Sequence, residues 1–204
     1  TNPENSDYQK ILNEVNIITS HVDDISEFRV IGGEPLMNKD WANIADGLLK
    51  DDPKRKVNIW TNGTVGPKND QLELLQGKGV SFVITDYGKF SKNIENMKEK
   101  LTKYNLAFVS TEVKNWVDCS SLKHHQRTTT QLQEVYKQCC AKYLYTLLDG
   151  KLYSCPFIAN AAKLKAIKDN PANYVDLYSD TEVVKTKIKR LMGGVKFLPG
   201  CDFC

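Results

Sequence analysis

Six cysteines are the residues best suited to chemistry, and they lie at positions 119, 139, 140, 155, 201 and 204. Cys201 and Cys204 form a Cys-x-x-Cys pair, a spacing that suits two thiolates on one metal ion or cluster. Cys140 and Cys155 flank an Asp-Gly dipeptide at 149–150, a strong hairpin signal that would bring the two thiols together. These four thiols favour an iron–sulfur cluster first and zinc second, and a site without metal stays open.

The remaining cysteines and a histidine pair have simpler interpretations. Cys119, Cys139 and Cys140 can equally be buried small apolar residues, and Cys119 has no partner at ligand spacing. His124 and His125 have the chemistry of metal ligands or acid–base groups. They lie in a basic, polar stretch, however, which favours a solvated loop.

Three short polar motifs follow apolar runs that predict strands: Gly32-Gly33-Glu34-Pro35, Trp60-Thr61-Asn62-Gly63-Thr64 and Thr85-Asp86-Tyr87-Gly88. Two glycines at the end of a strand let the backbone approach a ligand closely. Taken alone, each motif is most simply a turn, with Glu34 as a solvated charge. Ligands of parallel α/β folds bind at the carboxyl ends of the strands, so the convergence of three motifs on one rim predicts a binding site there.

The elements that must position these motifs alternate along the first half of the chain. Apolar runs predict strands at 28–31, 57–60, 80–85 and 106–110. Helical spacing of apolar residues predicts helices at 7–20, 69–77 and 91–104, and one more between Asn38 and Pro53. This alternation, at roughly 25 residues per unit, indicates β/α units with a parallel sheet and right-handed crossovers. It fits a barrel, a partial barrel or an open doubly wound sheet equally well.

The organisation changes near residue 112. Residues 115–131 are polar and irregular, and a hairpin is predicted from strands at 143–148 and 151–154. A helix is predicted at 181–191, followed by a loop from 193 to 204. We therefore expect two domains, a β/α core at 1–138 and a cysteine-bearing region at 139–204.

Composition narrows the class of protein. The chain has 204 residues, of which 41% are hydrophobic, enough for a substantial core. Its 28 basic and 25 acidic residues give a net charge of only +3, which provides no reason to expect a nucleic-acid or membrane partner. The sequence contains neither an apolar run of membrane-spanning length nor a signal-peptide pattern. The cysteines are too sparse for a secreted disulfide scaffold, so we expect a cytoplasmic, reduced protein.

Two sets of motifs resemble a known superfamily. Gly-Gly-Glu-Pro-Leu at 32–36 and Thr-Asn-Gly-Thr at 61–64, at this separation, resemble the radical S-adenosylmethionine (radical SAM) superfamily. Cys140-x9-Gly150-x4-Cys155, followed by Cys201-x2-Cys204, resembles its SPASM/twitch extension. The resemblance covers nearly the whole chain. It implies an α/β fold, a partial parallel β/α (TIM-like) barrel with a small C-terminal cysteine-bearing hairpin extension.

The resemblance also implies cofactors and the residues that bind them. Gly32, Gly33 and Glu34 would face the methionine amino group of S-adenosylmethionine, while Thr61 and Asn62 would lie near its ribose and carboxylate. The whole implied cofactor site comprises Gly32, Gly33, Glu34, Pro35, Thr61, Asn62, Thr85 and Asp86. An auxiliary [4Fe–4S] cluster would be held by Cys140, Cys155, Cys201 and Cys204, with Cys139 able to substitute for Cys140.

One part of the superfamily pattern is absent from these 204 residues. The catalytic [4Fe–4S] cluster of the superfamily is held by Cys-x3-Cys-x2-Cys after the first barrel strand, and no such motif occurs here. The segment is expected before Thr1, because the helix at 7–20 would be the first helix of the barrel. Since the sequence stops at Cys204, it would support at most one auxiliary cluster. We therefore expect this chain to be inactive by itself.

The intact enzyme would reductively cleave S-adenosylmethionine and abstract hydrogen from a small-molecule or peptide substrate. Its electrons would come from a reductant protein of the flavodoxin or ferredoxin type. A second hypothesis is a zinc-stabilised or metal-free α/β binding module without redox chemistry. A third is a different α/β enzyme with Glu34 and Asp86 as acid–base residues, which requires both carboxylates to face one pocket.

Overall fold

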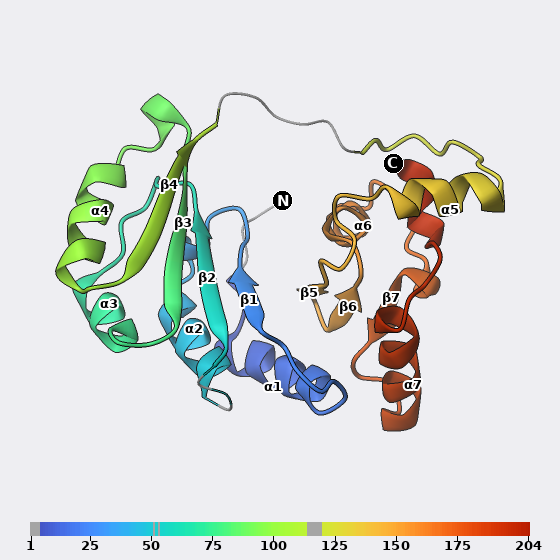
Figure 1. The fold of residues 1–204 in the computed structure, drawn as a ribbon, viewed down its shortest axis with the longest axis horizontal. Coiled ribbons are helices and arrows are strands. Elements are labelled where there is room, and N and C mark those ends of the chain that lie inside the picture. The colour runs from blue at the N-terminus through green and yellow to red at the C-terminus, as the bar shows by residue number, and fades with distance from the viewer. Residues whose placement is uncertain (1–4, 51, 53, 114–119) are drawn as a thin grey trace. The chain divides into compact units, whose positions relative to one another are not determined.

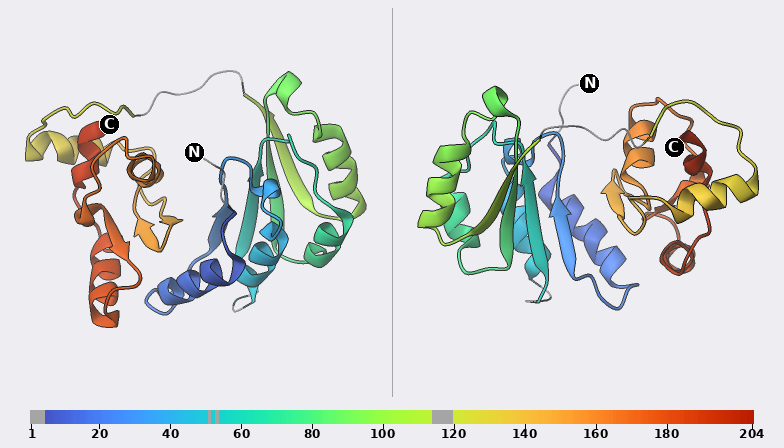
Figure 2. Two further views of the ribbon diagram at one scale, coloured as in Figure 1. Left: turned by 180° about the vertical axis from the view of Figure 1, so that it is seen from behind. Right: turned by 45° about the horizontal axis from the view of Figure 1, so that its top comes forward.

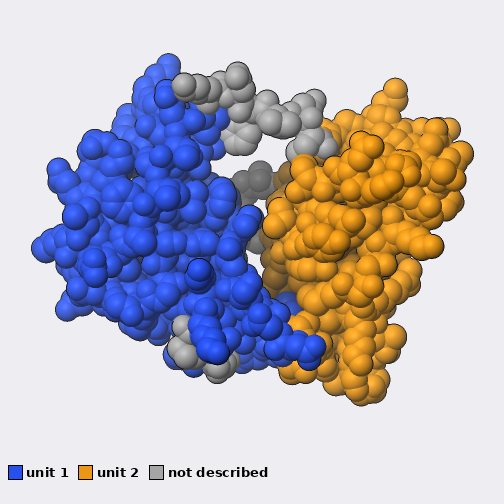
Figure 3. Space-filling model, viewed as in Figure 1, with its two compact units in different colours: residues 1–19, 23–116 blue, residues 20–22, 117–204 orange. Residues whose placement is uncertain are grey.

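A computed structural model describes residues 5–50, 52, 54–113 and 120–204. The chain divides into two compact units, shown in separate colours in Figure 3. Unit 1 comprises residues 1–19 and 23–116, and unit 2 comprises residues 20–22 and 117–204. Cys119, which we interpreted as a buried apolar residue, lies outside the described residues.

Unit 1 is a four-stranded parallel sheet flanked by helices (Figure 1). Its elements are α1 (Tyr8–Thr19), β1 (Glu27–Val30), η1 (Pro35–Met37), α2 (Trp41–Leu49), β2 (Lys56–Thr61), α3 (Asn69–Leu75), β3 (Val80–Asp86), η2 (Gly88–Phe90), α4 (Ile94–Lys103) and β4 (Ala107–Glu112). The strand order is β1-β2-β3-β4, so the described chain advances one strand at a time without reversing direction. A doubly wound sheet reverses at its switch point, whereas this order is compatible with part of a β/α barrel.

One face of this sheet holds the core of unit 1. Ile59 of β2 and Phe82 of β3 are paired in register and fully buried. Trp41 of α2 is 1% exposed and meets Phe82 edge-on, with ring centroids 5.9 Å apart. On the opposite face, Trp60 is 38% exposed, and Arg29 lies over its ring at 5.5 Å. The two central strands, β2 and β3, therefore alternate between a fully buried and a partly exposed face.

Unit 2 is built on a small antiparallel sheet of order β5-β6-β7. Its elements are α5 (Thr129–Lys137), β5 (Thr146–Leu148), β6 (Lys151–Tyr153), α6 (Pro156–Lys163), η3 (Pro171–Asn173), β7 (Tyr174–Asp176), α7 (Thr181–Met192) and η4 (Pro199–Phe203). Asp149 and Gly150 form the turn between β5 and β6, with φ of 51° and 78°. Such a turn needs two positive φ angles, which is why this dipeptide predicts a hairpin. Figure 2 shows the sheet and its helices from two further directions.

Two α-helices and one strand of unit 2 were not predicted from the sequence, and the tail predicted as a loop from 193 to 204 contains η4. Helix α5 has no buried residue and contains few apolar side chains. Helix α6 has eight residues and β7 has three, lengths at which periodicity gives little signal. Helix α5 does carry a capping box, in which the side chains of Thr128 and Gln131 each accept from the other's backbone amide. None of the described helices has the length and apolar character needed to cross a membrane.

Candidate functional sites

The Glu34 carboxylate connects the loops that follow β1 and β2 through hydrogen bonds. Its two carboxylate oxygens each lie 2.9 Å from the Thr61 hydroxyl. The backbone amides of Asn62 and Leu36 donate to the same carboxylate at 2.8 and 3.0 Å. The interpretation of Glu34 as a solvated charge is therefore wrong, because the carboxylate is occupied by donors from two loops. These bonds fix the shape of the rim where β1 and β2 end.

The glycines of this rim have different roles. Gly63 has φ of 69°, and an added Cβ would lie 2.6 Å from Cγ1 of Ile94, so both backbone and packing require glycine there. Gly32 and Gly33 are exposed and have no positive φ, and a Cβ at either would meet nothing within 4 Å. The fold does not need glycine at 32 and 33. Their bare backbone lies open at the carboxyl end of β1.

The third motif is joined to the second through a residue that the sequence analysis did not select. Ser91, which is 7% exposed, donates to the backbone carbonyl of Asn62 at 2.5 Å. Its hydroxyl also accepts from the Tyr87 amide at 2.9 Å. Asp86 accepts from the Gly88 amide within its own loop at 2.7 Å. The structure thus brings the loops after β2 and β3 together through Ser91.

The remaining predicted side chains of this rim make other contacts. Thr85 is paired in register with Thr111 on β4, and Pro35 is buried as the first residue of η1. Asn62 uses its side-chain oxygen to accept from the Thr64 amide at 2.9 Å, which closes its turn. The hypothesis that Glu34 and Asp86 act as an acid–base pair is not supported by the described contacts. The Glu34 carboxylate already accepts hydrogen bonds from protein donors, and no contact between the two carboxylates is described.

Five cysteines of unit 2 line one pocket of about 300 Å³. They come from three segments, the turn after α5, the start of α6 and η4: Cys139, Cys140, Cys155, Cys201 and Cys204. Apolar side chains, including Ile158 and Leu198, complete the wall. These cysteines, far apart in the sequence, thus line a shared pocket.

The thiols of this pocket differ in burial. Cys201 is buried, Cys139, Cys155 and Cys204 are half-buried, and Cys140 is exposed. Burial raises the pKa of Cys201, and the nearby Cys155 and Cys139 thiols raise it further. The Leu198 amide donates to the Cys201 sulfur at 3.4 Å and lowers the pKa in part. Without a metal, Cys201 is therefore a protonated thiol at neutral pH, whereas a bound cation would favour its thiolate.

A buried carboxylate holds the Cys-x-x-Cys segment in place. Asp202 is 4% exposed, and it accepts from the backbone amides of Gln126 and Arg127 at 2.9 Å each. His124 Nε2 lies 2.8 Å from the same carboxylate. Burial acts to raise the pKa of Asp202, but the two amides and the charges of His124 and Arg127 outweigh it, so the pKa is lowered.

Further contacts join the 121–127 segment and the core of unit 2 to η4. The Ser121 amide donates to the Phe203 carbonyl at 2.8 Å, and the His125 amide to the Asp202 carbonyl at 3.1 Å. Gly200 donates to Asn173 Oδ1 at 3.0 Å, and a Cβ on Gly200 would lie 2.2 Å from Cδ1 of Ile158. The interpretation of 123–127 as a merely solvated loop is thus incomplete, since its backbone is bound to η4.

The thiols share a pocket without forming a finished metal centre. In the part of the chain that the structure describes, no group of three or more His, Cys, Asp or Glu side chains has the arrangement needed to hold a metal ion. The assignment of these cysteines as cluster ligands stays a prediction.

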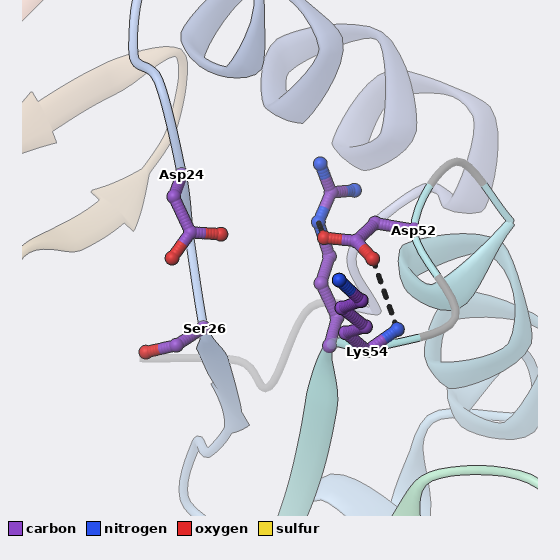
Figure 4. A pocket seen from close by; sticks show the side chains of 5 residues that line it. Asp24, Ser26, Asp52 and Lys54 are labelled. Atoms are coloured by element: carbon purple, nitrogen blue, oxygen red, sulfur yellow. Dashed lines mark hydrogen bonds and ion pairs between the residues drawn. The ribbon is translucent and has the colours of Figure 1, made fainter.

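A second pocket, of about 410 Å³, lies where β1 and β2 begin (Figure 4). Asp24 and Ser26 lie on one side, Asp52 and Lys54 lie on the other, and Arg55 also lines the pocket. Asp52 accepts from the Lys54 amide at 2.9 Å, and its carboxylate lies 3.8 Å from Arg55 Nε. Charges of both signs line this pocket, at the opposite end of the strands from the three motifs.

The comparisons with known proteins identify no family. The sequence matches no protein-family model, and no curated protein matches it significantly. The strand-end motifs and the thiol pocket are therefore the features that point to a function.

Proposed function

We propose that this chain forms part of a radical SAM enzyme, in which unit 2 holds an auxiliary [4Fe–4S] cluster and unit 1 binds S-adenosylmethionine at the carboxyl ends of its strands. The observation that carries the proposal is the thiol pocket, in which five cysteines from three separate segments line one cavity. Structural cysteines are commonly dispersed through a core as small apolar residues. A gathering of five around one pocket favours a soft metal or cluster.

The chemistry of the pocket supports a cluster over a single zinc ion. A structural zinc site is closed and tetrahedral, with Zn–S distances of about 2.3 Å. The thiol pocket has a volume of about 300 Å³, roughly ten times the volume of one water molecule in the liquid. This is more space than a closed site for one zinc ion requires. Cys155, Cys201, Cys204 and one of the adjacent pair at 139–140 would supply the four thiolates. When bound, the cluster supplies one-electron transfer or direct binding of a substrate.

The rim of unit 1 supports the S-adenosylmethionine part of the proposal. Gly32 and Gly33 present bare backbone that the fold itself does not require to be glycine. Their peptide groups would meet the methionine amino group. Glu34 would act indirectly, since its contacts to Thr61 and Asn62 hold the loops in register. Thr85 and Asp86 remain candidates at the next strand end, and a small-molecule or peptide substrate would bind beside the cofactor.

Anaerobic reconstitution of the purified chain with ferrous iron and sulfide tests the cluster. We expect about four iron and four sulfide per chain, together with visible thiolate-to-iron absorbance. Cys201→Ser removes the buried sulfur and should abolish both signals. A matched control is Ser154→Ala, which alters the same pocket without removing a thiol. Iron binding that persists in Cys201→Ser at full stoichiometry would contradict the assignment.

One observation favours the alternative of a zinc-stabilised or metal-free binding module. Within the described residues, no three donors are already arranged for a metal ion. The reconstitution distinguishes the two cases. One zinc per chain without visible absorbance would support the zinc-stabilised module, and a protein that takes up neither metal would support the metal-free one.

A further inference from the structure

Two adjacent thiols, Cys139 and Cys140, compete for the fourth position in the proposed cluster. The motif spacing assigns this position to Cys140. We infer that Cys139 is the fourth ligand and that Cys140 lies outside the cluster. This inference rests on the proposed cluster site, and it names which thiol of the pair completes that site.

Burial separates the two side chains. Cys139 is half-buried, like Cys155 and Cys204, whereas Cys140 is exposed. Solvent exposure and hydrogen bonds to sulfur set the reduction potential of a cluster. We therefore expect the ligands of one cluster to be thiols that are similarly shielded from solvent. Both residues border the pocket, but only Cys139 shares the burial of the other half-buried thiols.

The backbone explains why the two neighbours differ. Helix α5 ends at Lys137, and the Cys139 amide donates to the Tyr136 carbonyl at 3.2 Å. The Cys139 carbonyl in turn accepts from the Lys142 amide at 3.3 Å. These two bonds hold Cys139 in consecutive turns. Consecutive side chains of a turn diverge, so Cys139 and Cys140 have different surroundings, and only Cys139 is shielded.

The matched pair Cys139→Ser and Cys140→Ser tests the inference after anaerobic reconstitution with ferrous iron and sulfide. We expect Cys140→Ser to retain the iron content and visible spectrum of the unaltered chain. Cys139→Ser should lose most of the iron and bleach more than tenfold faster in air. Circular dichroism of the apo proteins checks that both variants fold.

A measurement on the unaltered chain removes any dependence on folding of the variants. The reconstituted and apo proteins are treated with iodoacetamide, and alkylation is located by mass spectrometry. We expect Cys139 to be protected in the reconstituted protein and Cys140 to be alkylated in both. Protection of Cys140 with alkylation of Cys139, or equal iron in both serine variants, would overturn the inference while leaving the cluster proposal intact. An unaltered chain that binds no iron would instead refute the cluster proposal itself.

Discussion

The hydroxyl of Thr61 lies 2.9 Å from both carboxylate oxygens of Glu34, across 27 residues of sequence. The same hydroxyl accepts from the Gly63 amide at 3.2 Å. Thr61 is 2% exposed, so it is a buried connection between the ends of β1 and β2. The residues that resemble a cofactor motif are therefore also the residues that build the rim.

Replacing Thr61 should destabilise unit 1. Thr61→Val keeps the shape but leaves the Glu34 carboxylate and the Gly63 amide each short of a partner. We expect a loss of about 1–3 kcal/mol in the free energy of unfolding, measured by urea denaturation. Thr64→Val is the control, because its hydroxyl is exposed and its loss should cost less than about 0.5 kcal/mol. Equal effects of the two changes would argue against a structural role for the Glu34 link.

The two kinds of glycine in the rim should respond differently to alanine. Gly63→Ala places a Cβ at 2.6 Å from Ile94 in a left-handed backbone, and we expect a loss of about 1–3 kcal/mol. Gly32→Ala meets nothing within 4 Å and should leave the unfolding free energy within about 0.5 kcal/mol. Chemical denaturation of both variants measures the difference. A large loss in Gly32→Ala would mean that the fold requires this glycine after all.

Gly32 should matter for the ligand instead. Gly32→Val adds bulk where the proposed methionine end of S-adenosylmethionine approaches the backbone. We expect at least about tenfold weaker binding by isothermal titration calorimetry, or ~1.4 kcal/mol, with an unchanged melting temperature. Gly77→Ala is the control for a glycine change remote from the rim: its φ of 75° makes alanine strained there, so it can lower stability but should leave binding unaltered. Undiminished binding by Gly32→Val would remove Gly32 from the proposed site.

Asp202 should give unit 2 an acid-sensitive stability. The folded pKa of this carboxyl is lowered below its usual value by the bound amides and the nearby positive charges. Its contribution is therefore present above the unfolded pKa and is lost as the pH falls through the lower, folded pKa. Asp202→Asn should cost about 1–3 kcal/mol at pH 6, and the gap to the unaltered chain should shrink towards pH 2.

A surface carboxylate supplies the control for this pH dependence. Asp169 pairs with Lys151 at 2.7 Å, and its side chain is 39% exposed. Asp169→Asn should cost at most about 1 kcal/mol at pH 6. Urea denaturation at both pH values compares the variants. A gap for Asp202→Asn that stays constant down to pH 2 would contradict the assignment of the effect to ionised Asp202.

Gly200→Ala tests the packing of η4 against α6. Its Cβ would lie 2.2 Å from Cδ1 of Ile158, a side chain that is 1% exposed and has little room to move. We expect a loss of about 1–3 kcal/mol by thermal or chemical denaturation. Combining it with Ile158→Ala should cost less than the sum of the two single changes. Strict additivity would show that the two residues do not interact.

Unit 1 could be predicted from the sequence because its strands and helices carry strong apolar periodicity. The run at 80–85 and the helical spacing of Ile94, Met97 and Leu101 correspond to β3 and α4. Strand order was less accessible. The alternation of strands and helices fits several strand orders. The structure shows that each strand pairs with the next one along the chain, in the order β1-β2-β3-β4.

The parts that could not be predicted depend on long-range polar contacts. Asp202 lies between Cys201 and Cys204, which are the obvious candidates for chemistry in this segment. Its hydrogen-bond partners Gln126 and Arg127 are about 75 residues away in the sequence. The contacts of Ser91 with the loops after β2 and β3 could not be predicted either. The spacing of apolar residues says nothing about which partners a serine hydroxyl will have. The choice between Cys139 and Cys140 depends on how one turn after α5 directs two neighbours.

The bonds from Asp202 to residues 126 and 127 also have a consequence for the order of folding. Contacts this distant in sequence form slowly, because a long loop must close before they give any stabilisation. During synthesis Cys139 and Cys155 leave the ribosome well before Asp202, so the wall of their pocket is incomplete until η4 arrives. We therefore expect the thiols of nascent chains to react rapidly with alkylating reagents until residue 202 has been added. Loading of any metal would then have to await the folding of η4.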